Sequence, residues 1–374
     1  MRFWNKLTFI AVIFAAMGAM AMVPAHAAHK FKIYLSMSYI GNDWQAEAAN
    51  DLKALAASKD YRDKVDLRIQ VAGPNAQRQV QQINAMVQAG ANAIVVYPIS
   101  PTALNGAVKH ACAHHVVIAA YDSIITEPCA YNTHIDQSAW GRIAAKWLAK
   151  AMHGKGNIVM ITGVAGTTVD TLRVAAAKKV FAKYPGIHVI ASGNGMWSQA
   201  VARTVLSNII ATHPWKTIDG LWMEAGCYTA YSMMSESGIP DNKLIPCAGE
   251  GGNGHRIQML PEGTKVEGAH GTYRPMGVRS ISLSSQIYPG AMALKMVVAV
   301  LEHKKVPKLV MLSPRPVTSA EVKMCKTGSW KEMEDGCNTF PPSLVPNPGW
   351  FASIYSPKLP QLGFEAALVG QPEN

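Results

Sequence analysis

The sequence lacks the features that mark several common classes of protein. Only 16% of its 374 residues are charged, and no residue type is abundant enough for a fibrous or low-complexity chain. A hydrophobic fraction of 49% excludes a disordered chain. Basic residues form no stripe interleaved with aromatic residues, so the net charge of +11 is weak support for a nucleic-acid or anionic-membrane partner. After the first 23 residues no apolar run is long enough to span a membrane. We expect a soluble protein of about two domains, without a nucleic-acid partner.

Motifs for nucleotide, metal and hydrolytic chemistry are absent or poorly placed. The chain has no G-x-x-x-x-G-K-[ST], no G-x-S-x-G and no C-x-x-C. The segment 249–254 formally matches G-x-G-x-x-G, but it comes late and places Glu250 against a pyrophosphate. His110 and His114 lie four residues apart on a predicted helix, yet no third metal ligand accompanies them. We therefore expect no cofactor and no metal ion.

The first 27 residues have the three parts of a secretory signal peptide. Arg2 and Lys6 precede an apolar run from Leu7 to Val23, and the small-x-small sequence 25–27 closes it. A retained membrane anchor is the alternative, although the run is slightly short of the roughly 20 residues that a spanning helix needs. We expect this signal peptide to be cleaved after residue 27 and the mature protein to be exported to the periplasm of a Gram-negative bacterium.

The six cysteines are best explained as disulfides, because an exported protein meets an oxidising compartment. Fifteen pairings are possible for six cysteines. Pairing neighbours along the chain gives short loops, and we favour it over a thiolate metal cluster, which needs tighter spacing. The expected disulfides are Cys112–Cys129, Cys227–Cys247 and Cys325–Cys337.

Apolar strand-like runs alternate with amphipathic helical segments along the mature chain. In the first half, strands are expected at 31–37, 66–71, 93–97 and 116–120, with helices that include 43–57 and 101–113. The pattern pauses at 130–135 and restarts with a helix that Ser138 can cap. In the second half, strands are expected at 157–161, 188–191, 218–223, 244–247 and 266–270, and helices at 172–183, 198–211 and 228–237. This alternation predicts an α/β protein with two doubly wound parallel-sheet lobes.

Polar and aromatic residues follow the ends of these strands, where ligands of open α/β sheets bind. The candidates are Ser38, Asn42, Trp44, Asp122, Arg173, Trp197, Glu224 and Glu250. Any one of them can be a helix cap or a core residue, but their recurrence at successive strand ends favours a site. The hydroxyl groups of a sugar or polyol both donate and accept hydrogen bonds, and its C–H faces pack on indole rings. A glycosidase with two carboxylates is the enzymatic alternative. Binding without turnover is simpler, so we expect no enzyme.

Four stretches resemble the periplasmic substrate-binding proteins of the ribose/galactose-binding type (type I), which serve ABC importers. They are residues 38–44, 117–122, 135–141 and 163–167, the last followed by an arginine ten residues after Gly163. The resemblance implies that Asn42, Trp44, Asp122 and Arg173 contact the ligand and that Trp197 stacks on its opposite face. It places the hinge glutamine near Ser284 or Gln286. Ser123, Glu224 and Glu250 depart from the residues usual in that family, which puts ribose itself in doubt and admits a ligand with an amino group.

The resemblance also implies the domain organisation and the mode of action. We expect an N-terminal lobe of residues 28–135 with 285–312, and a C-terminal lobe of residues 136–284 with 313–374, joined by a three-segment hinge. The part from residue 313 onward is longer than in small family members. The implied function is a monomeric binding protein that closes on a sugar or polyol and delivers it to an inner-membrane ABC permease. Delivery to a chemotaxis or sensor receptor, and binding of an amino sugar or nucleoside, are the alternatives.

Overall fold

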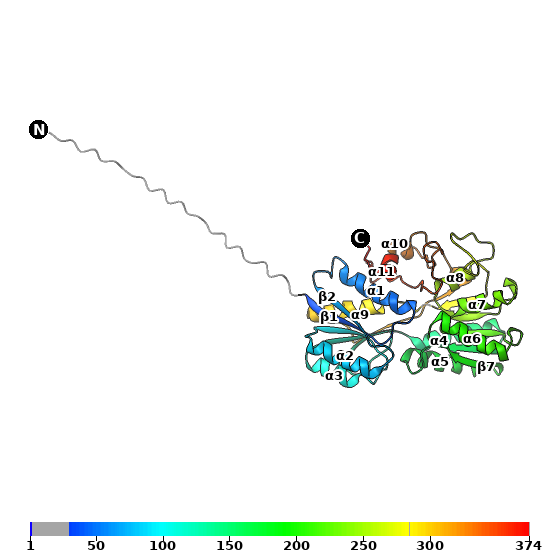
Figure 1. Ribbon diagram of the computed structural model, residues 1–374, viewed down its shortest axis with the longest axis horizontal. Helices are drawn as coiled ribbons and strands as arrows, with labels where there is room; N and C mark the ends of the chain where they lie inside the picture. Colours follow the sequence, from blue (N-terminus) through cyan, green and yellow to red (C-terminus); the bar gives the residue numbers. More distant parts are fainter. Residues whose placement is uncertain (2–29, 284, 374) are drawn as a thin grey trace.

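The computed structural model describes Met1, residues 30–283 and residues 285–373. The expected signal peptide, apart from Met1, and the hinge candidate Ser284 lie outside these described residues. The rest of the chain forms two α/β lobes side by side, each built on one six-stranded sheet (Figure 1). We call them the N lobe and the C lobe. The expectation of two doubly wound lobes is confirmed.

The N lobe has a wholly parallel sheet in the order β11-β5-β4-β3-β1-β2. Its strands are β1 (Phe31–Met37), β2 (Val65–Val71), β3 (Ala93–Tyr97), β4 (Val117–Tyr121), β5 (Tyr131–Ile135) and β11 (Leu309–Leu312). One face is covered by α1 (Asp43–Ala57) and α9 (Pro289–Leu301), and the other by α2 (Ala76–Gln88) and α3 (Asn105–Ala113). The central strand β3 is buried along its whole length, because helices cover both of its faces.

The C lobe has the sheet order β12-β10-β9-β8-β6-β7, in which only the pair β10–β12 is antiparallel. Its strands are β6 (Lys155–Thr162), β7 (Gly186–Asn194), β8 (Gly220–Met223), β9 (Cys247–Glu250), β10 (Ser280–Leu283) and β12 (Pro316–Thr318). Helices α4 (Gln137–Ala151) and α5 (Thr168–Phe181) pack on one face, and α6 (Gln199–Thr212) and α7 (Cys227–Glu236) on the other. The short helices α8 (Asn253–Met259), η1 (Trp215–Thr217) and η2 (Asp241–Lys243) complete it.

The chain passes between the two sheets three times. It leaves the N lobe between β5 and α4, returns between β10 and α9, and leaves again between β11 and β12. The last crossing joins two strands directly, without a helix between them, since β11 ends at Leu312 and β12 begins at Pro316. These crossings bring the ends of strands from both sheets to one region between the lobes.

Several local predictions are wrong. The expected pause at 130–135 contains β5, and the strand expected at 244–247 is β9, which begins only at Cys247. Residues 266–270 form exposed turns rather than a strand, because Gly268 has a φ of +75°, a left-handed conformation that a strand does not contain. The strand that continues the sheet is β10. Helix α4 begins at Gln137, and its cap is Asp136, whose carboxylate accepts the Ala139 backbone N–H at 2.8 Å.

The three expected disulfides are confirmed. Cys112 pairs with Cys129, Cys227 with Cys247 and Cys325 with Cys337, across sequence separations of 17, 20 and 12 residues. The first two lie one in each lobe, and the third lies in the C-terminal segment, which we define as residues 319–373. Among the described helices none combines the length and the apolar character needed to cross a membrane.

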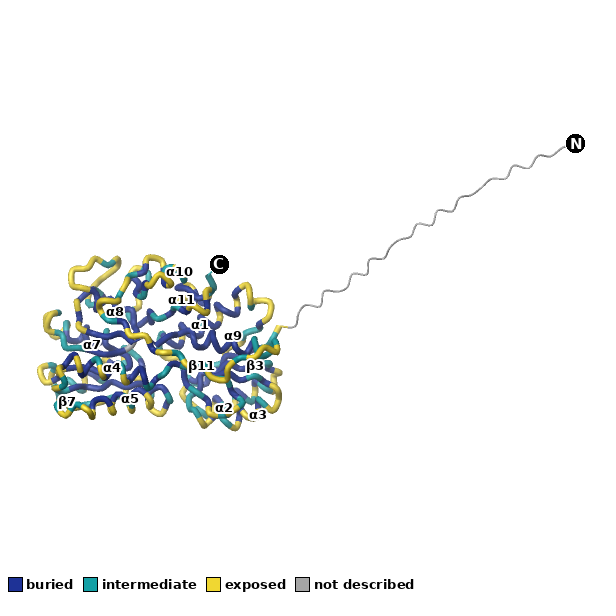
Figure 2. The backbone as a smooth tube through the Cα atoms, turned by 180° about the vertical axis from the view of Figure 1, so that it is seen from behind, coloured by how far each residue is buried: buried dark blue, intermediate teal, exposed yellow. Residues whose placement is uncertain are grey.

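The C-terminal segment contacts both lobes, and the assignment of residues 313–374 to the C lobe stays a prediction. The segment holds η3 (Ser319–Glu321), α10 (Trp330–Glu334) and α11 (Phe364–Val369), joined by irregular chain (Figure 1). Its aromatic residues Phe340, Trp350 and Phe364 join the hydrophobic core that contains α1 and α9 of the N lobe. Figure 2 shows buried stretches of backbone near α11. Irregular chain of this kind becomes ordered here because its apolar side chains share the core of a lobe.

Candidate functional site

A small pocket with a cavity volume of about 30 Å³ lies between the lobes, beside the strand ends of both sheets. Asn42, Trp44, Gln45, Tyr97 and Asp122 come from the N lobe, and Val169, Arg173, Trp197 and Glu224 from the C lobe, with Ser285 from a crossing and Phe351 from the C-terminal segment. The lining of the pocket therefore combines aromatic rings with carboxyl, guanidinium and amide groups. This composition is typical of small-molecule sites.

Six of the nine side chains expected in a site line this pocket: Asn42, Trp44, Asp122, Arg173, Trp197 and Glu224. Ser38 is buried and lines a smaller neighbouring pocket together with Tyr39 and Trp197. The backbone of Glu250 ends β9, but its side chain, like Ser284, lies outside what the structure describes.

The start of α1 connects the two lobes at the pocket. Asn42 caps this helix by accepting the Gln45 backbone N–H at 3.2 Å, and its amide donates to the Trp197 carbonyl of the C lobe at 3.1 Å. Two residues further on, the Trp44 indole N–H donates to the Ser285 carbonyl at 3.0 Å. A helix cap is a local device, yet here the capping side chain also makes a contact between lobes.

Asp122 and Arg173 come from different lobes and are joined through Gln137. The Gln137 amide donates to Asp122 Oδ1 at 3.1 Å, and Arg173 Nε donates to Gln137 Oε1 at 2.8 Å. Arg173 Nη2 also donates to the Ser285 hydroxyl at 3.3 Å. Asp122 has a φ of +60°, so the end of β4 holds this carboxylate in a strained left-handed conformation. Strain of this kind is often found where a side chain must be aimed into a site.

Glu224 lies on the other side of the Arg173 guanidinium. Its Oε2 accepts the Trp197 indole N–H at 2.7 Å and lies 3.6 Å from Arg173 Nη1, while its Oε1 is buried without a hydrogen-bond partner in the described residues. The guanidinium carbon lies 4.3 Å from the centre of the Trp140 ring, which adds a cation–π contact. Glu224 thus lines the pocket with one carboxyl oxygen engaged and the other without a hydrogen-bond partner among the described residues.

Burial gives the two carboxyl groups different protonation states. It raises the pKa of Asp122 to about 6, against the lowering effect of Arg173 and of the Gln137 hydrogen bond. It raises the pKa of Glu224 to about 8, opposed by the Arg173 charge and reinforced by the Asp170 charge. At pH 7 the site therefore presents one carboxylate at Asp122, one guanidinium at Arg173 and a protonated carboxyl at Glu224, which donates a hydrogen bond.

Five pocket residues were not expected from the sequence: Gln45, Tyr97, Val169, Ser285 and Phe351. Tyr97 ends β3, so the same strand-end rule that singled out Asp122 applies to it. Ser285 follows the hinge candidate Ser284 directly. No sequence signal distinguishes Phe351, because it reaches the pocket only through the fold of the C-terminal segment.

A metal site is not indicated by the described side chains. One cluster of three ligand types, Cys325, Glu332 and Cys337, was found among them. The two cysteines are joined in a disulfide and therefore offer no thiolate.

Comparisons with known proteins agree with this architecture. A model of the periplasmic binding protein domain matches residues 33–305. The xylitol-binding protein of Mycolicibacterium smegmatis is 27% identical over 184 residues, which are 48% of this chain and 52% of that protein. The ribose import binding protein of Escherichia coli is 22% identical over 207 residues, or 55% and 68% of the two chains. The match thus spans only about half the length of the first of these relatives.

Solved structures show the same fold. An ABC transporter solute binding protein from Thermobispora bispora has a TM-score of 0.68 at 23% identity, over 78% of this chain and 86% of that one. A galactofuranose binding protein has a TM-score of 0.67 at 18% identity, over 82% and 98%.

Proposed function

The chain belongs to the periplasmic binding protein domain family, and on this premise we propose that it captures a sugar or sugar-like polyol between its lobes and delivers it to an inner-membrane ABC permease. We also propose that residues 1–27 direct export to the periplasm and are then removed. The site residues are those of the pocket between the lobes, led by Trp44, Asp122 and Arg173.

One observation carries this proposal: a carboxylate of the N lobe and a guanidinium of the C lobe meet through Gln137, and both line a pocket that also has aromatic side chains in its lining. Each hydroxyl of a polyol needs both a donor and an acceptor, and Asp122, Arg173 and protonated Glu224 supply both. A ligand that lacks one of these hydroxyls leaves a buried polar group unpaired, at a cost of about 1–3 kcal/mol. Such a site selects its ligand by hydroxyl pattern.

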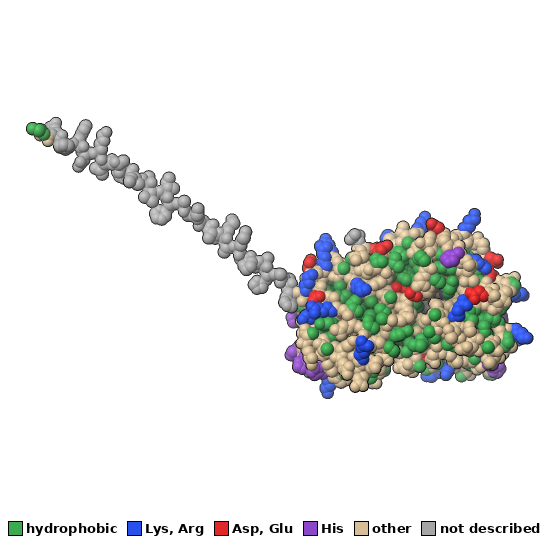
Figure 3. Space-filling view, in the orientation of Figure 1, with side chains coloured by type: hydrophobic (Ala, Val, Ile, Leu, Met, Phe, Trp, Pro, Cys, Tyr) green, Lys and Arg blue, Asp and Glu red, His purple; other side chains and the backbone are tan. Residues whose placement is uncertain are grey.

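The two lobes provide the mechanism. The three crossings between the sheets allow the lobes to close over a ligand, and the ligand shifts the population towards the closed form because it contacts both lobes there. The permease then distinguishes the closed protein from the open one. Figure 3 shows basic side chains spread over the visible face rather than gathered in one patch, which favours a small neutral ligand over a polyanion.

A thermal-shift panel tests the proposal. The mature protein is heated with xylitol, D-ribose, L-arabinose, D-allose, myo-inositol, an amino sugar and a nucleoside, each in excess. A ligand at about 100 times its Kd adds about 2.7 kcal/mol to the stability. The amino sugar tests whether the carboxyl groups select a cationic ligand.

The variants Trp44→Ala, Asp122→Ala and Arg173→Ala should each remain folded and lose this stabilisation. Asp63→Ala should keep it, because the Asp63 side chain is 82% exposed and does not line the pocket. Persistence of ligand stabilisation in all three pocket variants would show that the ligand binds elsewhere.

A further inference from the structure

The C-terminal segment reaches the pocket with one aromatic side chain, that of Phe351. This side chain lines the pocket and is 5% exposed. The family model matches only residues 33–305, so Phe351 comes from a part of the chain outside the family match. One wall of the pocket is therefore supplied by a segment that the family relationship does not explain.

Backbone contacts with the C lobe hold the chain around Phe351. Phe351 forms an antiparallel bridge with Gly252, and the Ala352 N–H donates to the Gly251 carbonyl at 3.0 Å. On the other side, the Asn253 N–H donates to the Trp350 carbonyl at 2.6 Å. This stretch thus runs beside the start of α8 like a short added strand.

Contacts with the N lobe hold the same residue from the opposite side. The Phe351 N–H donates to Glu47 Oε1 at 2.8 Å. Glu47 lies three residues after Trp44 on α1, so one face of this helix directs Trp44 into the pocket and Glu47 to the base of Phe351. Glu47 is 2% exposed, and burial raises its pKa well above the ordinary value, while the hydrogen bond from the Phe351 N–H lowers it.

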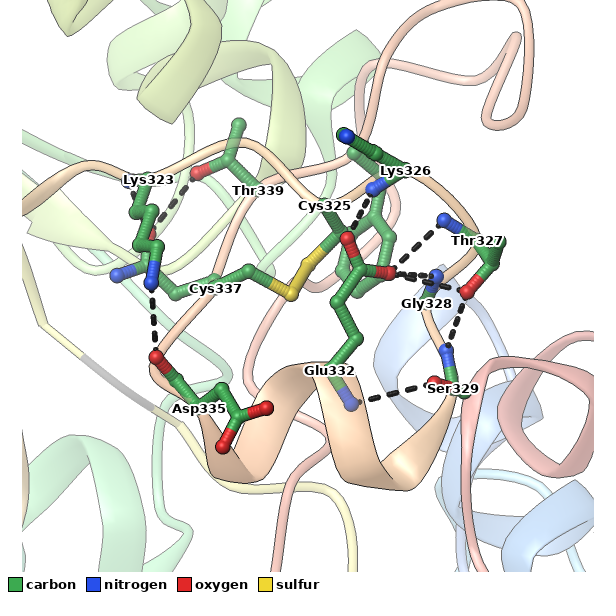
Figure 4. Close-up of a disulfide and its surroundings, with 12 residues drawn as sticks. Lys323, Cys325, Lys326, Thr327, Gly328, Ser329, Glu332, Asp335, Cys337 and Thr339 are labelled. Carbon is green, nitrogen blue, oxygen red and sulfur yellow. Dashed lines mark hydrogen bonds between the residues drawn. A yellow bond between two sulfur atoms is a disulfide. The ribbon is translucent and has the colours of Figure 1, made fainter.

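The segment itself is cross-linked and anchored. Figure 4 shows the Cys325–Cys337 disulfide beside Glu332, whose carboxylate accepts the backbone N–H groups of Lys326, Thr327 and Gly328. Arg256 of α8 is buried and donates to the Asn338 carbonyl at 2.6 Å and to the Ser353 hydroxyl at 2.7 Å. In this arrangement of the lobes these contacts hold the Phe351 backbone in place, and such preorganisation favours affinity.

We propose that Phe351 is a specificity-determining residue of the ligand site, and that its ring covers an edge of the bound polyol that carries only C–H groups. The proposal rests on the proposed function. A phenyl ring neither donates nor accepts an ordinary hydrogen bond. A hydroxyl group packed against it therefore loses its hydrogen bonds to water and gains none from the protein. A C–H edge packs on the ring at no such cost. Phe351 therefore selects compact ligands with an unsubstituted edge, and Glu47 is its positioning residue.

Calorimetric titration of the full mature protein tests this proposal with xylitol, D-ribose, L-arabinose, D-allose and myo-inositol. For Phe351→Ala we expect the Kd of the best ligand to rise at least about tenfold. The ranking should also shift towards the larger D-allose and myo-inositol, because the wall that excludes added substituents is gone.

Phe364→Ala is the matched control. Phe364 belongs to the same segment and is buried in the core, but it does not line the pocket. Its removal should lower the thermal stability and leave the ligand ranking unchanged. A ranking shift in Phe364→Ala equal to that in Phe351→Ala would mean that loosening of the whole segment, not the Phe351 ring, sets specificity, and it would overturn the proposal.

Two substitutions at Glu47 test whether its hydrogen bond with the Phe351 N–H positions the Phe351 ring, or whether Glu47 only fills space in the core. Glu47→Gln keeps an oxygen that accepts the Phe351 N–H and should leave the ranking unchanged. Glu47→Leu removes the acceptor and should shift the ranking in the same direction as Phe351→Ala. If Phe351→Ala leaves both Kd and ranking unchanged, the proposal fails while the proposed function stands. If the natural protein binds none of the five compounds, the proposed function fails and this proposal fails with it.

Discussion

Replacing Glu224 with glutamine should flatten the dependence of the protein's stability on pH. Burial raises the pKa of Glu224 to about 8 in the folded protein, against an ordinary value of 4.5. The folded state therefore binds a proton that the unfolded state has released. Its contribution to stability is fully present below pH 4.5 and is lost as the pH rises towards 8.

The size of the effect follows from one proton. Uptake of one proton on folding changes the free energy of unfolding by about 1.4 kcal/mol per pH unit, or about 3 kcal/mol between pH 5 and 7. Asp122, whose pKa is about 6, also lowers the stability as the pH rises, mainly between pH 5 and 6. Glu224→Gln removes the pH dependence that comes from Glu224 and leaves the pH dependence that comes from Asp122.

Urea unfolding at pH 5, 6 and 7, with the disulfides intact, measures the difference. The natural protein should lose about 3 kcal/mol more than Glu224→Gln over this range. Glu334→Gln, at an exposed residue that pairs with Lys331, should follow the natural protein. Parallel pH profiles for Glu224→Gln and the natural protein would show that Glu224 is ionised when buried, and would refute the assignment of a hydrogen-bond-donating carboxyl to the site.

Further predictions concern helix packing, cross-links and the site cation. In Gly141→Ala the new Cβ would lie 2.1 Å from the Arg173 carbonyl oxygen, so α5 must shift; thermal unfolding should show a loss of stability and calorimetry a weaker ligand affinity. Gly106→Ala, also within a helix but with open space around its Cβ, should instead stabilise the protein by up to about 1 kcal/mol. Joint replacement of Cys227 and Cys247 by serine should lower the free energy of unfolding by about 2–5 kcal/mol in urea titrations. Arg173→Lys should not restore the binding lost in Arg173→Ala, since a lysine cannot contact Gln137, Ser285 and Glu224 together; equal Kd values for lysine and arginine would contradict this.

The sequence predicted the sheet well where strands are long and buried. The run at β3 is apolar throughout because both of its faces are covered, and this pattern is visible without a structure. β10 has only four residues, and its short sequence SISL carries too little periodicity to be recognised. The segment 266–270 has apolar residues but contains Gly268 in a left-handed conformation. The pattern of apolar residues does not predict this backbone conformation.

The sequence was sufficient to predict those site residues that directly follow a strand. Asp122 and Glu224 directly follow strands, so topology alone brings them to the pocket. Gln137 was not expected to join Asp122 to Arg173, because that contact depends on the relative placement of two lobes. Phe351 lay beyond prediction for a different reason: it belongs to irregular chain whose path is set by packing against α1 and α8, not by local periodicity.

Hydrogen exchange with and without ligand tests most directly whether the ligand is held between the lobes. The mature protein is compared alone and with the panel compound that stabilises it most, with Asp122→Ala as the control. We expect added protection on both sides of the pocket, in residues 42–45 of the N lobe and around Arg173 and Trp197 of the C lobe, and none in Asp122→Ala. Protection confined to one lobe, or equal in the variant, would contradict the account.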